Sequence, residues 1–503
     1  MHTALLLDMM ADAAPDRLAF GRRDEGLTYS EARRRARHGA AWLSQFGGDN
    51  VVFIGLNGTA LPLSVFASGL LAKPYAPLNY RLTDADLNRL LARTAPSTAI
   101  VDDDMAARLS EHPGVKVVRR SEFEAACGAA GETDAEFPEA DHDIAVLLFT
   151  SGTTGEPKAA ILRHANLTSY VISTVEFMGS DEDEAALVSV PPYHIAGISA
   201  ILTGVYGGRR VVHLEAFTPE EWVQVAAREG ITHAMVVPTM LGRILDVLES
   251  RGETLPQLRA LSYGGGRMPQ PVIERAIKLM PHLDFVNAYG LTETSSTIAM
   301  LSPDDHRVAM ASEDEKVRRR LGSVGRPLPS VELEIRGPDG KPVGPGVSGE
   351  IYVRGEQVSG EYAHKKALTA DGWFATNDGG WMDDEGYLFV EGRLDDVIVR
   401  GGENISPGEI EDVLREHPEV ADVAVLGLPD DQWGETVACA IVPRGDRPSE
   451  ADLAAWVKAR LRSTKTPEVW AFREALPYND TGKLLRRQLK AEMAGAASGL
   501  ARV

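Results

Sequence analysis

Cysteine is nearly absent from this chain, which has only Cys127 and Cys439 among its 503 residues. The two lie far apart and in neither a CxxC nor a Cys/His spacing, so the sequence supports neither a disulfide framework nor a zinc site. We expect both to be inert thiols.

Long apolar runs are also absent. The chain has no stretch of about 18 apolar residues that could cross a bilayer. At the N-terminus, MHTALLLDMM, Asp8 interrupts the apolar run and no basic segment precedes it, so a signal peptide is not predicted. We therefore expect a cytoplasmic protein with no integral membrane association.

The chain also lacks an excess of basic residues. The chain has 52 Lys and Arg against 73 Asp and Glu, a formal net charge of -21. Such a charge repels nucleic-acid backbones and anionic lipid, so neither is an expected partner. Hydrophobic residues make up 44% and charged residues 25%, which is typical of proteins with large buried cores, and the length suggests several domains.

Short apolar runs alternate with helical patterns between about residues 50 and 290. Runs this rich in Val, Ile and Leu, separated by helices, are typical of parallel strands covered on both faces. We expect an α/β body. The runs are VVFIGL, STAIVDD, AVLLFTSG, ALVSVPP, RRVVHL, THAMVV, RALSYGGG and DFVNAYG.

The pattern changes between about residues 320 and 400. Here VELEIRG, GEIYVRG, GYLFVEG and DVIVRGG alternate polar and apolar residues between Gly, Asp and Pro turns, which predicts a small antiparallel β unit. The last hundred residues form another α/β patch. Its first helix is predicted to start at Ser406, with Pro407 in the first turn and Glu409 completing a capping box.

A loop rich in Gly and Thr follows the apolar strand AVLLF. It runs from Thr150 through Ser151, Gly152, Thr153, Thr154 and Gly155 to Lys158. Glycines let backbone amides point at a polyanion, hydroxyls add donors and a lysine adds a mobile charge, so we interpret this loop as a phosphate-binding loop. The Walker pattern GxxxxGK[ST] is absent, which excludes a P-loop NTPase, and a solvated turn is the alternative.

With nine further segments in order, this loop resembles the adenylate-forming superfamily of acyl-CoA synthetases, adenylation domains and beetle luciferases. The resemblance covers nearly the whole chain and is closest to bacterial fatty or aryl acyl-CoA synthetases. The segments are PYHIAG (192–197), GGG (264–266), YGLTE (289–293), GSVGRP (322–327), DGWF (371–374), TND (376–378), GRLDD (392–396), GGEN (401–404) and PYNDTGK (477–483).

The resemblance implies a fold and a division of the chain. The fold is α/β, with a large N-terminal domain of parallel α/β subdomains plus a small β-barrel-like unit, followed by a small mobile C-terminal α+β domain. Residues 1–394 would form the adenylation domain for ATP and the acyl substrate, and residues 395–503 the mobile domain with a hinge at Asp395.

The resemblance also implies a nucleotide site. Tyr289 would lie on the adenine, with Gly290 beside it as a further nucleotide-binding candidate. Thr292 would bond the α-phosphate, and Glu293 would hold the Mg²⁺ ion that neutralises the phosphates. The remaining ATP- and AMP-binding candidates are Gly264, Gly265 and Gly266 beside the adenine and Asp378 and Arg393 beside the ribose. Each could instead be an ordinary cap, turn or surface charge.

Lys483 is the predicted catalytic residue of the first half-reaction. Attack of a carboxylate on the α-phosphorus joins two anions, so a mobile cation that touches both lowers the barrier. The alternative is a surface lysine in front of the basic helix LLRRQLK. For the second half-reaction, the resemblance implies rotation about Asp395 and a thiol tunnel lined by Gly401 and Gly402.

The acyl pocket is predicted from strand ends and motif positions. Its candidates are His194, Val236, Met240, Tyr263 and Gly266, and His194 would lie near the reacting carboxylate. PYHIAG offers no aspartate for a substrate ammonium, which disfavours amino acids. A medium-chain, branched, alicyclic or aromatic acid remains open.

The chain departs from the family pattern at three places. Asn377 replaces the usual glycine before Asp378, and asparagine tolerates left-handed backbone angles. Gly266 and Arg267 stand where Ala and Pro are common, so Arg267 either reaches a second substrate charge or faces solvent. Ala159 replaces a glycine after Lys158, which we expect to be harmless.

The predicted function is that of an acyl-CoA synthetase. A carboxylic acid and ATP would give acyl-AMP and pyrophosphate, and CoA would then release acyl-CoA and AMP, with ATP, Mg²⁺ and coenzyme A as cofactors, as in fatty acid metabolism. A ligase that loads a carrier protein and a non-catalytic nucleotide or acyl-CoA sensor are the alternatives. Retention of Glu293 and Lys483 argues against the sensor.

Overall fold

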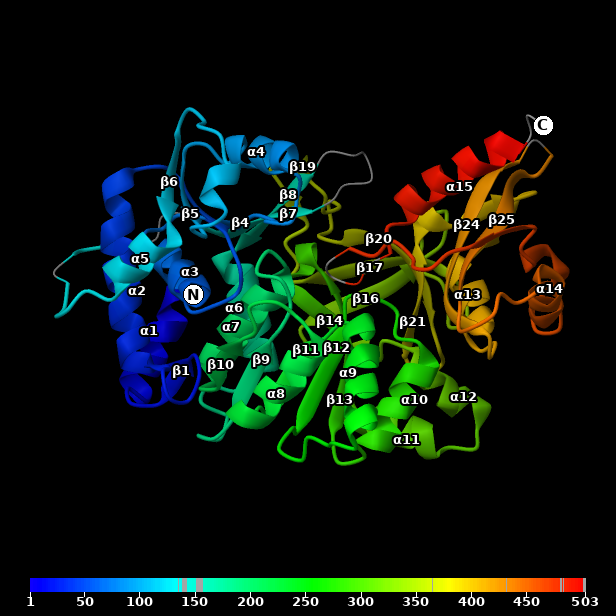
Figure 1. The fold of residues 1–503 in the computed structure, drawn as a ribbon, viewed down its shortest axis with the longest axis horizontal. Coiled ribbons are helices and arrows are strands. Elements are labelled where there is room, and N and C mark those ends of the chain that lie inside the picture. The colour runs from blue at the N-terminus through cyan, green and yellow to red at the C-terminus, as the bar shows by residue number, and fades with distance from the viewer. Residues whose placement is uncertain are drawn as a thin grey trace.

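The computed structural model describes residues 1–133, 135–137, 143–150, 157–363, 365–430, 432–479, 482 and 484–500. Two large sheets and a small antiparallel sheet form the N-terminal part. A separate C-terminal α/β unit with its own sheet lies beside them, in orange and red in Figure 1. This arrangement confirms the predicted α/β fold with a large N-terminal and a small C-terminal unit.

The first large sheet has nine strands in the order β15-β14-β13-β12-β11-β9-β10-β1-β2. Its centre, β9 to β13, is parallel, as the apolar runs predict. The strands are β1 Leu18–Phe20, β2 Leu27–Thr28, β9 Ala185–Val188, β10 Arg210–His213, β11 His233–Val236, β12 Ala260–Gly264, β13 Asp284–Leu291, β14 Ser296–Leu301 and β15 Arg326–Pro327.

The second large sheet has eight strands in the order β19-β18-β8-β7-β4-β3-β5-β6. Strands β3 to β7 are parallel, whereas β7 and β8 form an antiparallel hairpin. The strands are β3 Asn50–Ile54, β4 Tyr75–Pro77, β5 Ser97–Val101, β6 Val115–Arg119, β7 Ile144–Thr150, β8 Lys158–Arg163, β18 Glu361–Tyr362 and β19 Lys365–Lys366.

Helices fill the space between these sheets and cover their outer faces. The largest core joins α1 Ala4–Ala13, α2 Tyr29–Leu43, α3 Ala60–Leu70, α5 Arg120–Cys127, α6 His164–Thr174 and α7 Ile195–Gly207 to both sheets. The outer face of the nine-stranded sheet packs on α8 Pro219–Glu229, α9 Pro238–Arg251 and α10 Gln270–Leu279, and that of the eight-stranded sheet on α4 Asp84–Ala92. Burial on both faces explains why the strands lack polar alternation.

The small antiparallel unit is an open sheet in the order β16-β17-β20-β21, with strands β16 Val331–Arg336, β17 Gly349–Gly355, β20 Phe374–Met382 and β21 Leu388–Arg393. The barrel-like closure expected from the sequence is therefore wrong for the described residues, where β16 and β21 remain the two edges. The short helices α11 Pro303–Ala311 and α12 Glu315–Arg318 precede this unit.

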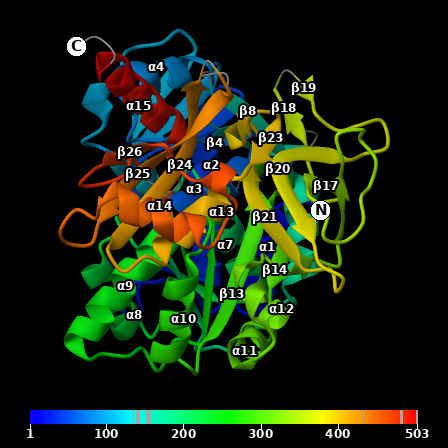
Figure 2. The same cartoon turned by 90° about the vertical axis from the view of Figure 1, so that its right-hand side faces the viewer.

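The C-terminal unit has a five-stranded sheet of β22 Ile398–Arg400, β23 Glu403–Ile405, β24 Val420–Asp430, β25 Gly434–Pro443 and β26 Val469–Phe472. Helices α13 Pro407–Arg415 and α14 Glu450–Lys458 pack on one face and α15 Arg486–Leu500 on the other, and α13 lies beside β21 of the small antiparallel sheet (Figure 2). The run DVIVRGG, expected in the small antiparallel unit, forms β22, which pairs with β23 and β25 instead.

Ser406 is the N-cap of α13, but the predicted capping box is wrong. The Ser406 hydroxyl donates to the backbone oxygen of Glu391 at 3.1 Å, and Glu409 pairs with Lys465. The Ser406 hydroxyl bonds outside the first turn because the helix starts where two units meet, whereas Glu409 pairs within the C-terminal unit.

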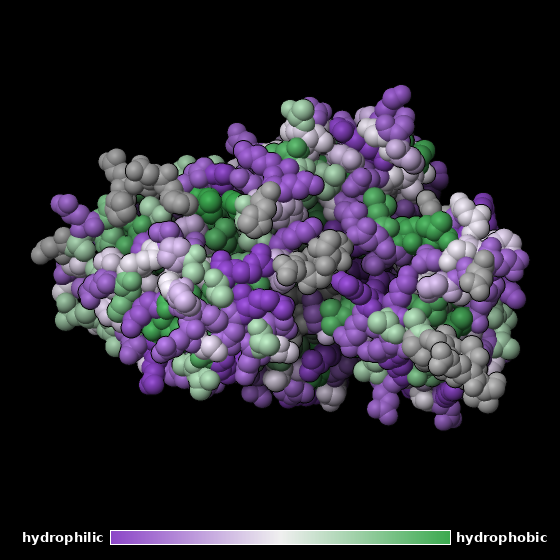
Figure 3. Space-filling view, turned by 90° about the horizontal axis from the view of Figure 1, so that it is seen from above, coloured by the Kyte–Doolittle hydropathy of each residue, from purple (hydrophilic) through white to green (hydrophobic). Residues whose placement is uncertain are grey.

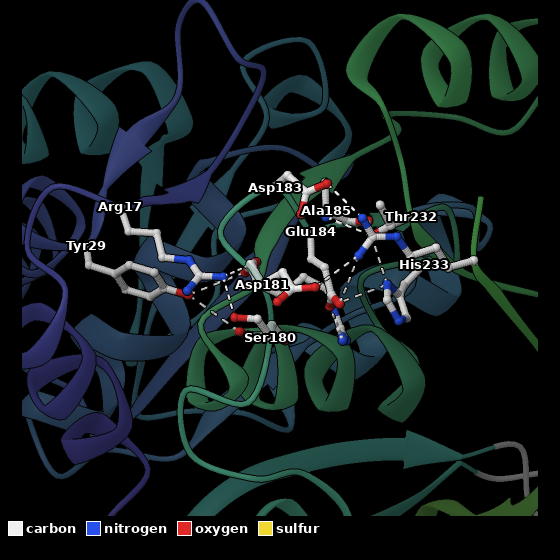
Figure 4. A network of polar contacts seen from close by, with 12 residues as sticks. Arg17, Tyr29, Ser180, Asp181, Asp183, Glu184, Ala185, Thr232 and His233 are labelled. Carbon is white, nitrogen blue, oxygen red and sulfur yellow. Dashed lines mark hydrogen bonds and ion pairs between the residues drawn. The ribbon is translucent and has the colours of Figure 1, made fainter. Parts of the chain in front are cut away.

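A network of charged and polar side chains lies at the amino ends of the parallel strands of the nine-stranded sheet (Figure 4). Glu184, just before β9, pairs with Arg209 at 2.7 Å and lies 3.7 Å from Nδ1 of His233, while Arg259 pairs with Asp183 at 2.8 Å. Burial opposes the ionisation of Glu184, but the hydrogen bond and charge of Arg209 lower its pKa. These ion pairs link the segments that precede neighbouring parallel strands.

The face seen from above is largely hydrophilic, with apolar side chains in separate small patches (Figure 3). Within the described part of the chain, no helix is long and apolar enough to cross a membrane.

Candidate active site

The predicted site segments follow the carboxyl ends of neighbouring parallel strands. Thr239 follows β11, Gly265 follows β12, and Glu293 follows β13. Carboxyl ends of parallel strands meet at one edge, where open α/β sheets bind their ligands. A Cβ built on Gly265 would lie 3.6 Å from Cγ1 of Val237, so these turns touch one another.

The predicted phosphate loop connects β7 to β8. Thr150 and Lys158 pair across this hairpin, and the Thr150 hydroxyl donates to the backbone oxygen of Lys158 at 3.4 Å. The Lys158 Nζ lies 6.0 Å from the ring centroid of Tyr362. The other candidates of the loop, Ser151, Gly152, Thr153 and Thr154, lie outside the described residues.

Glu293 is held by a tyrosine that the sequence does not single out. The Tyr362 hydroxyl donates to Oε1 of Glu293 at 2.6 Å, and burial together with the Glu293 charge raises the Tyr362 pKa. Ser359 and Gly360 donate backbone amides to the Glu293 carbonyl. Because Tyr362 also faces Lys158, the predicted metal ligand and the end of the phosphate loop lie together, next to Thr292.

Tyr289, Asp378 and Arg393 form a polar group between two sheets, in which Asp378 is buried and the other two side chains are partly buried. The Tyr289 hydroxyl donates to Oδ2 of Asp378 at 2.6 Å, and Nε of Arg393 lies 3.0 Å from Oδ1 of the same carboxylate. Burial, followed by the Asp378 charge, raises the Tyr289 pKa. Arg393 also donates to the Thr376 carbonyl at 2.9 Å. The structure thus brings the predicted adenine and ribose residues into direct contact.

Asn377 has φ of 60°, which confirms that asparagine replaces glycine in a left-handed position here. Its side-chain amide donates to Oδ2 of Asp395 at 2.9 Å. Asp395 lies in a short 3-10 turn, Leu394–Asp396, between the last strand of the small sheet and the C-terminal sheet. The predicted ribose turn and the predicted hinge are therefore joined, although rotation about Asp395 and the domain boundary at 394 and 395 remain predictions.

Two glycines are required by close backbone approach. A Cβ at Gly290 would lie 1.8 Å from the Ser296 carbonyl oxygen, and one at Gly264 would lie 2.3 Å from that of Ala288. Any side chain at either position would push β13 away from its neighbour. Gly266 has open surroundings, since a Cβ there would lie 3.9 Å from Pro238, and it leads into Arg267.

A cleft of about 320 Å³ lies between the strand ends and a turn of the C-terminal unit. The turn contributes Tyr478, Asn479 and Gly482, and a Cβ at Gly482 would lie 2.8 Å from Oγ1 of Thr239. Lys483, which follows, lies outside the described residues. The N-terminal walls are Asn57, Tyr80, Arg81, Ser189, Pro191, Glu215, Ala216, Phe217, Val237, Thr239, Met240 and Arg243.

The acyl-pocket candidates separate in the structure. Met240 lines the cleft, whereas Val236 and Tyr263 are fully buried, the latter with its hydroxyl 2.7 Å from Nε2 of His306. His194 is the N-cap of α7, and its Nδ1 accepts from the amide of Ala196 at 3.2 Å. Tyr263 thus packs in the helix-covered core, because successive side chains of β12 point to opposite faces of the sheet and Tyr263 points to the covered face.

The predicted thiol-tunnel glycines form the turn between β22 and β23. Gly401 has φ of 58° and a Cβ there would lie 2.9 Å from the ring of Trp433, whereas Gly402 has φ of 84° and a Cβ there would meet no atom of the described residues within 4 Å. The backbone angles at both positions therefore favour glycine, but only at position 402 is there space for a side chain among the described residues.

Sequence reasoning missed Tyr362, Arg81 and Arg243. Tyr362 sits on a two-residue strand in no recognisable motif, and its role emerges only when β18 pairs with β8. The two arginines belong to α-helical and loop patterns that resemble any solvated surface. No local signal could have identified them.

Two family descriptions match the chain. "AMP-binding enzyme" matches residues 7–363, and "AMP-binding enzyme C-terminal domain" matches residues 409–483.

Individual proteins match over nearly the whole length. A feruloyl-CoA synthase of Amycolatopsis sp is 34% identical over 92% of this chain and 93% of its own. A 2-succinylbenzoate–CoA ligase of Bacillus licheniformis is 34% identical over 96% of this chain and 98% of its own. The o-succinylbenzoate CoA synthetase of Bacillus subtilis, solved with its acyl-adenylate intermediate, is 30% identical with a TM-score of 0.83, covering 96% of this chain and 97% of its own. It has also been solved with ATP and a magnesium ion.

Proposed function

The chain belongs to the AMP-binding enzymes as an ATP-dependent, AMP-forming acyl-CoA synthetase, and we propose that it activates an aromatic carboxylic acid at the edge where β11, β12 and β13 end. Two relatives at 34% identity are named for feruloyl and 2-succinylbenzoate groups, both of which are aromatic. The apolar walls of the cleft, Phe217, Val237 and Met240, suit such a ring. The observation that carries the proposal is the meeting of these strand ends with the Gly482 turn.

Residues of two sheets would bind the nucleotide. The buried carboxylate of Asp378, oriented by Tyr289 and Arg393, can accept hydrogen bonds from ribose hydroxyls. The ring of Tyr289 and the glycines at 264 and 290 would leave a flat slot for the adenine.

The donor set fits Mg²⁺ held mainly by phosphates. Among the described residues, no group of three or more His, Cys, Asp and Glu could hold a metal alone. Mg²⁺ typically binds one or two carboxylates together with substrate phosphates, and Glu293 supplies one carboxylate near Lys158. Bound there, the ion would neutralise charge on the phosphates.

Lys483 would act on the reacting groups themselves. Its neighbour Gly482 contacts Thr239 at the strand ends, so a flexible cation one residue further along can reach the carboxylate and the α-phosphate. No general base is required because the acid is already ionised. His194 would lie beside the carboxylate, and the turn of Gly401 and Gly402 would line the thiol path after the C-terminal unit rotates.

The test is release of pyrophosphate and AMP by the purified protein with ATP and Mg²⁺, with and without CoA. The acids would include ferulate, 2-succinylbenzoate, benzoate, cyclohexanecarboxylate, isovalerate and octanoate, with mass spectrometry of the thioester. We expect the fastest CoA-dependent turnover with the aromatic acids.

Three other outcomes would each correct a separate part of the proposal. Preference for octanoate would overturn the aromatic assignment and leave the synthetase intact. Adenylate without thioester would favour transfer to a carrier protein. No pyrophosphate with any acid would favour the sensor.

A further inference from the structure

An ion pair joins the nucleotide side of the N-terminal part to the C-terminal unit. Arg267 directly follows the glycine turn after β12, and its Nη2 pairs with Oδ2 of Asp412 on α13. Each side chain is 40% exposed. A Cβ at Gly408 would lie 2.5 Å from Nη1 of Arg267, so the guanidinium lies against the first turn of α13 where glycine leaves it room. Arg267 therefore neither enters the acyl cleft nor faces solvent alone.

Helix α13 is in turn tied to the segment that carries Lys483. Glu411, next to Asp412, is buried, and its Oε1 accepts from Nη2 of Arg486 at 2.6 Å and from the amide of Val425 at 2.8 Å. Arg486 stands three positions after Lys483. Arg415 lies 3.6 Å from both Glu411 and Asp412. If α13 moves, the segment that follows Lys483 and contains Arg486 therefore moves with it.

The preceding flank of the turn is anchored as well. The Tyr478 hydroxyl donates to Asp422 at 2.8 Å, and Asp422 lies on β24, the strand that packs on α13. The turn between Tyr478 and Arg486 is thus fixed at both ends to one rigid body, and the position of that body decides whether Gly482 touches Thr239.

We propose that Arg267 is a positioning residue for the first half-reaction: by binding Asp412 it holds α13, and with it the Lys483 turn, against the strand ends that bind the nucleotide. This inference rests on the proposed role of Lys483. Arg267 acts through α13, not on the reactants, so its loss lowers the fraction of molecules in which the lysine is in place. The Tyr289, Asp378 and Arg393 group is unchanged, so ATP binding is unchanged.

The kinetic test is a double-mutant cycle on pyrophosphate release, with the acid most active in the wild type. Arg267→Ala and Asp412→Ala should each lower kcat by about 2- to 5-fold, the range expected for the loss of one partly exposed ion pair. The KM for ATP should stay constant, and the double variant should be no slower than either single one. Thioester formation from supplied acyl-adenylate should not fall. Arg267→Lys should retain most of the rate.

Arg275→Ala is the matched control. Arg275 on α10 is 34% exposed and pairs with Asp246 and Glu249 of the neighbouring helix α9, so its loss breaks ion pairs within one unit. Its kcat should equal that of the wild type. Additive losses in the cycle, or equal losses in both half-reactions, would overturn the positioning role.

A second measurement needs no substrate. Amide hydrogen exchange of residues 403–416 should be several-fold faster in Arg267→Ala than in the wild type and unchanged in Arg275→Ala, because α13 loses its contact with the N-terminal part. Unchanged exchange in Arg267→Ala would overturn the inference. If the wild type releases no pyrophosphate, the proposed function fails, whereas this measurement still decides whether Arg267 holds α13.

Discussion

The Tyr289 hydroxyl lies 2.6 Å from Oδ2 of Asp378, although Tyr289 belongs to the nine-stranded sheet and Asp378 to the small antiparallel sheet. Arg393 closes the group from the next strand, β21. A nucleotide bound at this group would contact two sheets at once, so their relative position is part of the binding site.

Removing either member of the pair should weaken ATP binding, but unequally. Tyr289→Phe loses one hydrogen bond worth about 1 kcal/mol and leaves Asp378 paired with Arg393, so the KM for ATP should rise a few-fold. Asp378→Asn leaves the Arg393 charge uncompensated, and the KM should rise by more than about 10-fold. Pyrophosphate release as a function of ATP concentration measures both, and a larger effect of Tyr289→Phe would contradict the assignment.

The Glu293 carboxylate should set the requirement for Mg²⁺. In Glu293→Gln we expect the Mg²⁺ concentration for half-maximal pyrophosphate release to rise by at least about 10-fold, because a charged oxygen ligand is lost. Tyr362→Phe is the matched variant, since it removes only the hydroxyl that bonds Glu293, and a shift of a few-fold is expected. Equal Mg²⁺ dependence in Glu293→Gln and wild type would remove Glu293 from the metal site.

Lys483→Ala should separate the two half-reactions. Adenylate formation should fall by at least about 100-fold because charge stabilisation at the transferring phosphate is lost. Thioester formation from supplied acyl-adenylate should be largely spared. Lys490→Ala, which breaks a 2.8 Å pair with Glu435 in the same unit, is the control and should leave both steps intact. Equal loss of both steps in Lys483→Ala would refute its assigned role.

Bulk at Gly402 should have the opposite effect. Gly402→Leu should block thioester formation and spare adenylation, since a side chain would enter the predicted thiol path. Because φ is 84° at this position, any side chain also strains the backbone, and Gly402→Ala controls for that strain. Normal CoA turnover in Gly402→Leu would place the thiol path elsewhere.

Stability should decline in mild acid because of His233. Burial, followed by the charge of Arg209, lowers the His233 pKa from 6.5 to about 4. The folded chain then holds fewer protons than the unfolded chain between these values, so the contribution is complete above pH 6.5 and is lost as pH falls toward 4. We expect about 2 kcal/mol to disappear over this range.

Urea unfolding at pH 7 and at pH 4.5 measures this loss. His233→Gln should show a smaller difference between the two pH values than the wild type, since glutamine does not titrate. The same difference in both proteins would assign the acid sensitivity to other groups.

Much of the fold could be predicted because buried parallel strands carry a strong local pattern. Each of the eight apolar runs between residues 50 and 290 contains a strand. The division into two sheets, and the pairing of β22 with β25, depend on contacts between distant segments that no local pattern encodes. The capping box failed for a similar reason, since Ser406 bonds to Glu391 across the unit boundary.

The site could be predicted only as far as its motifs reach. Tyr289, Glu293 and Asp378 stand in recognisable segments, Tyr289 and Asp378 make a direct hydrogen bond, and Asn377 takes the left-handed angle. Tyr362 and Arg267 act through partners 69 and 145 positions away. Tyr263 lies next to a site motif in the sequence, but the alternation of side chains along its strand points it into the core, where it bonds to His306.

The cleft takes Tyr478, Asn479 and Gly482 from the C-terminal unit and its remaining walls from the N-terminal part. A fragment ending near residue 394 would therefore present this cleft without its C-terminal wall. Ligand screens on such a fragment would rank acids by their fit to a cleft that lacks these three residues, so the ranking need not hold for the whole chain.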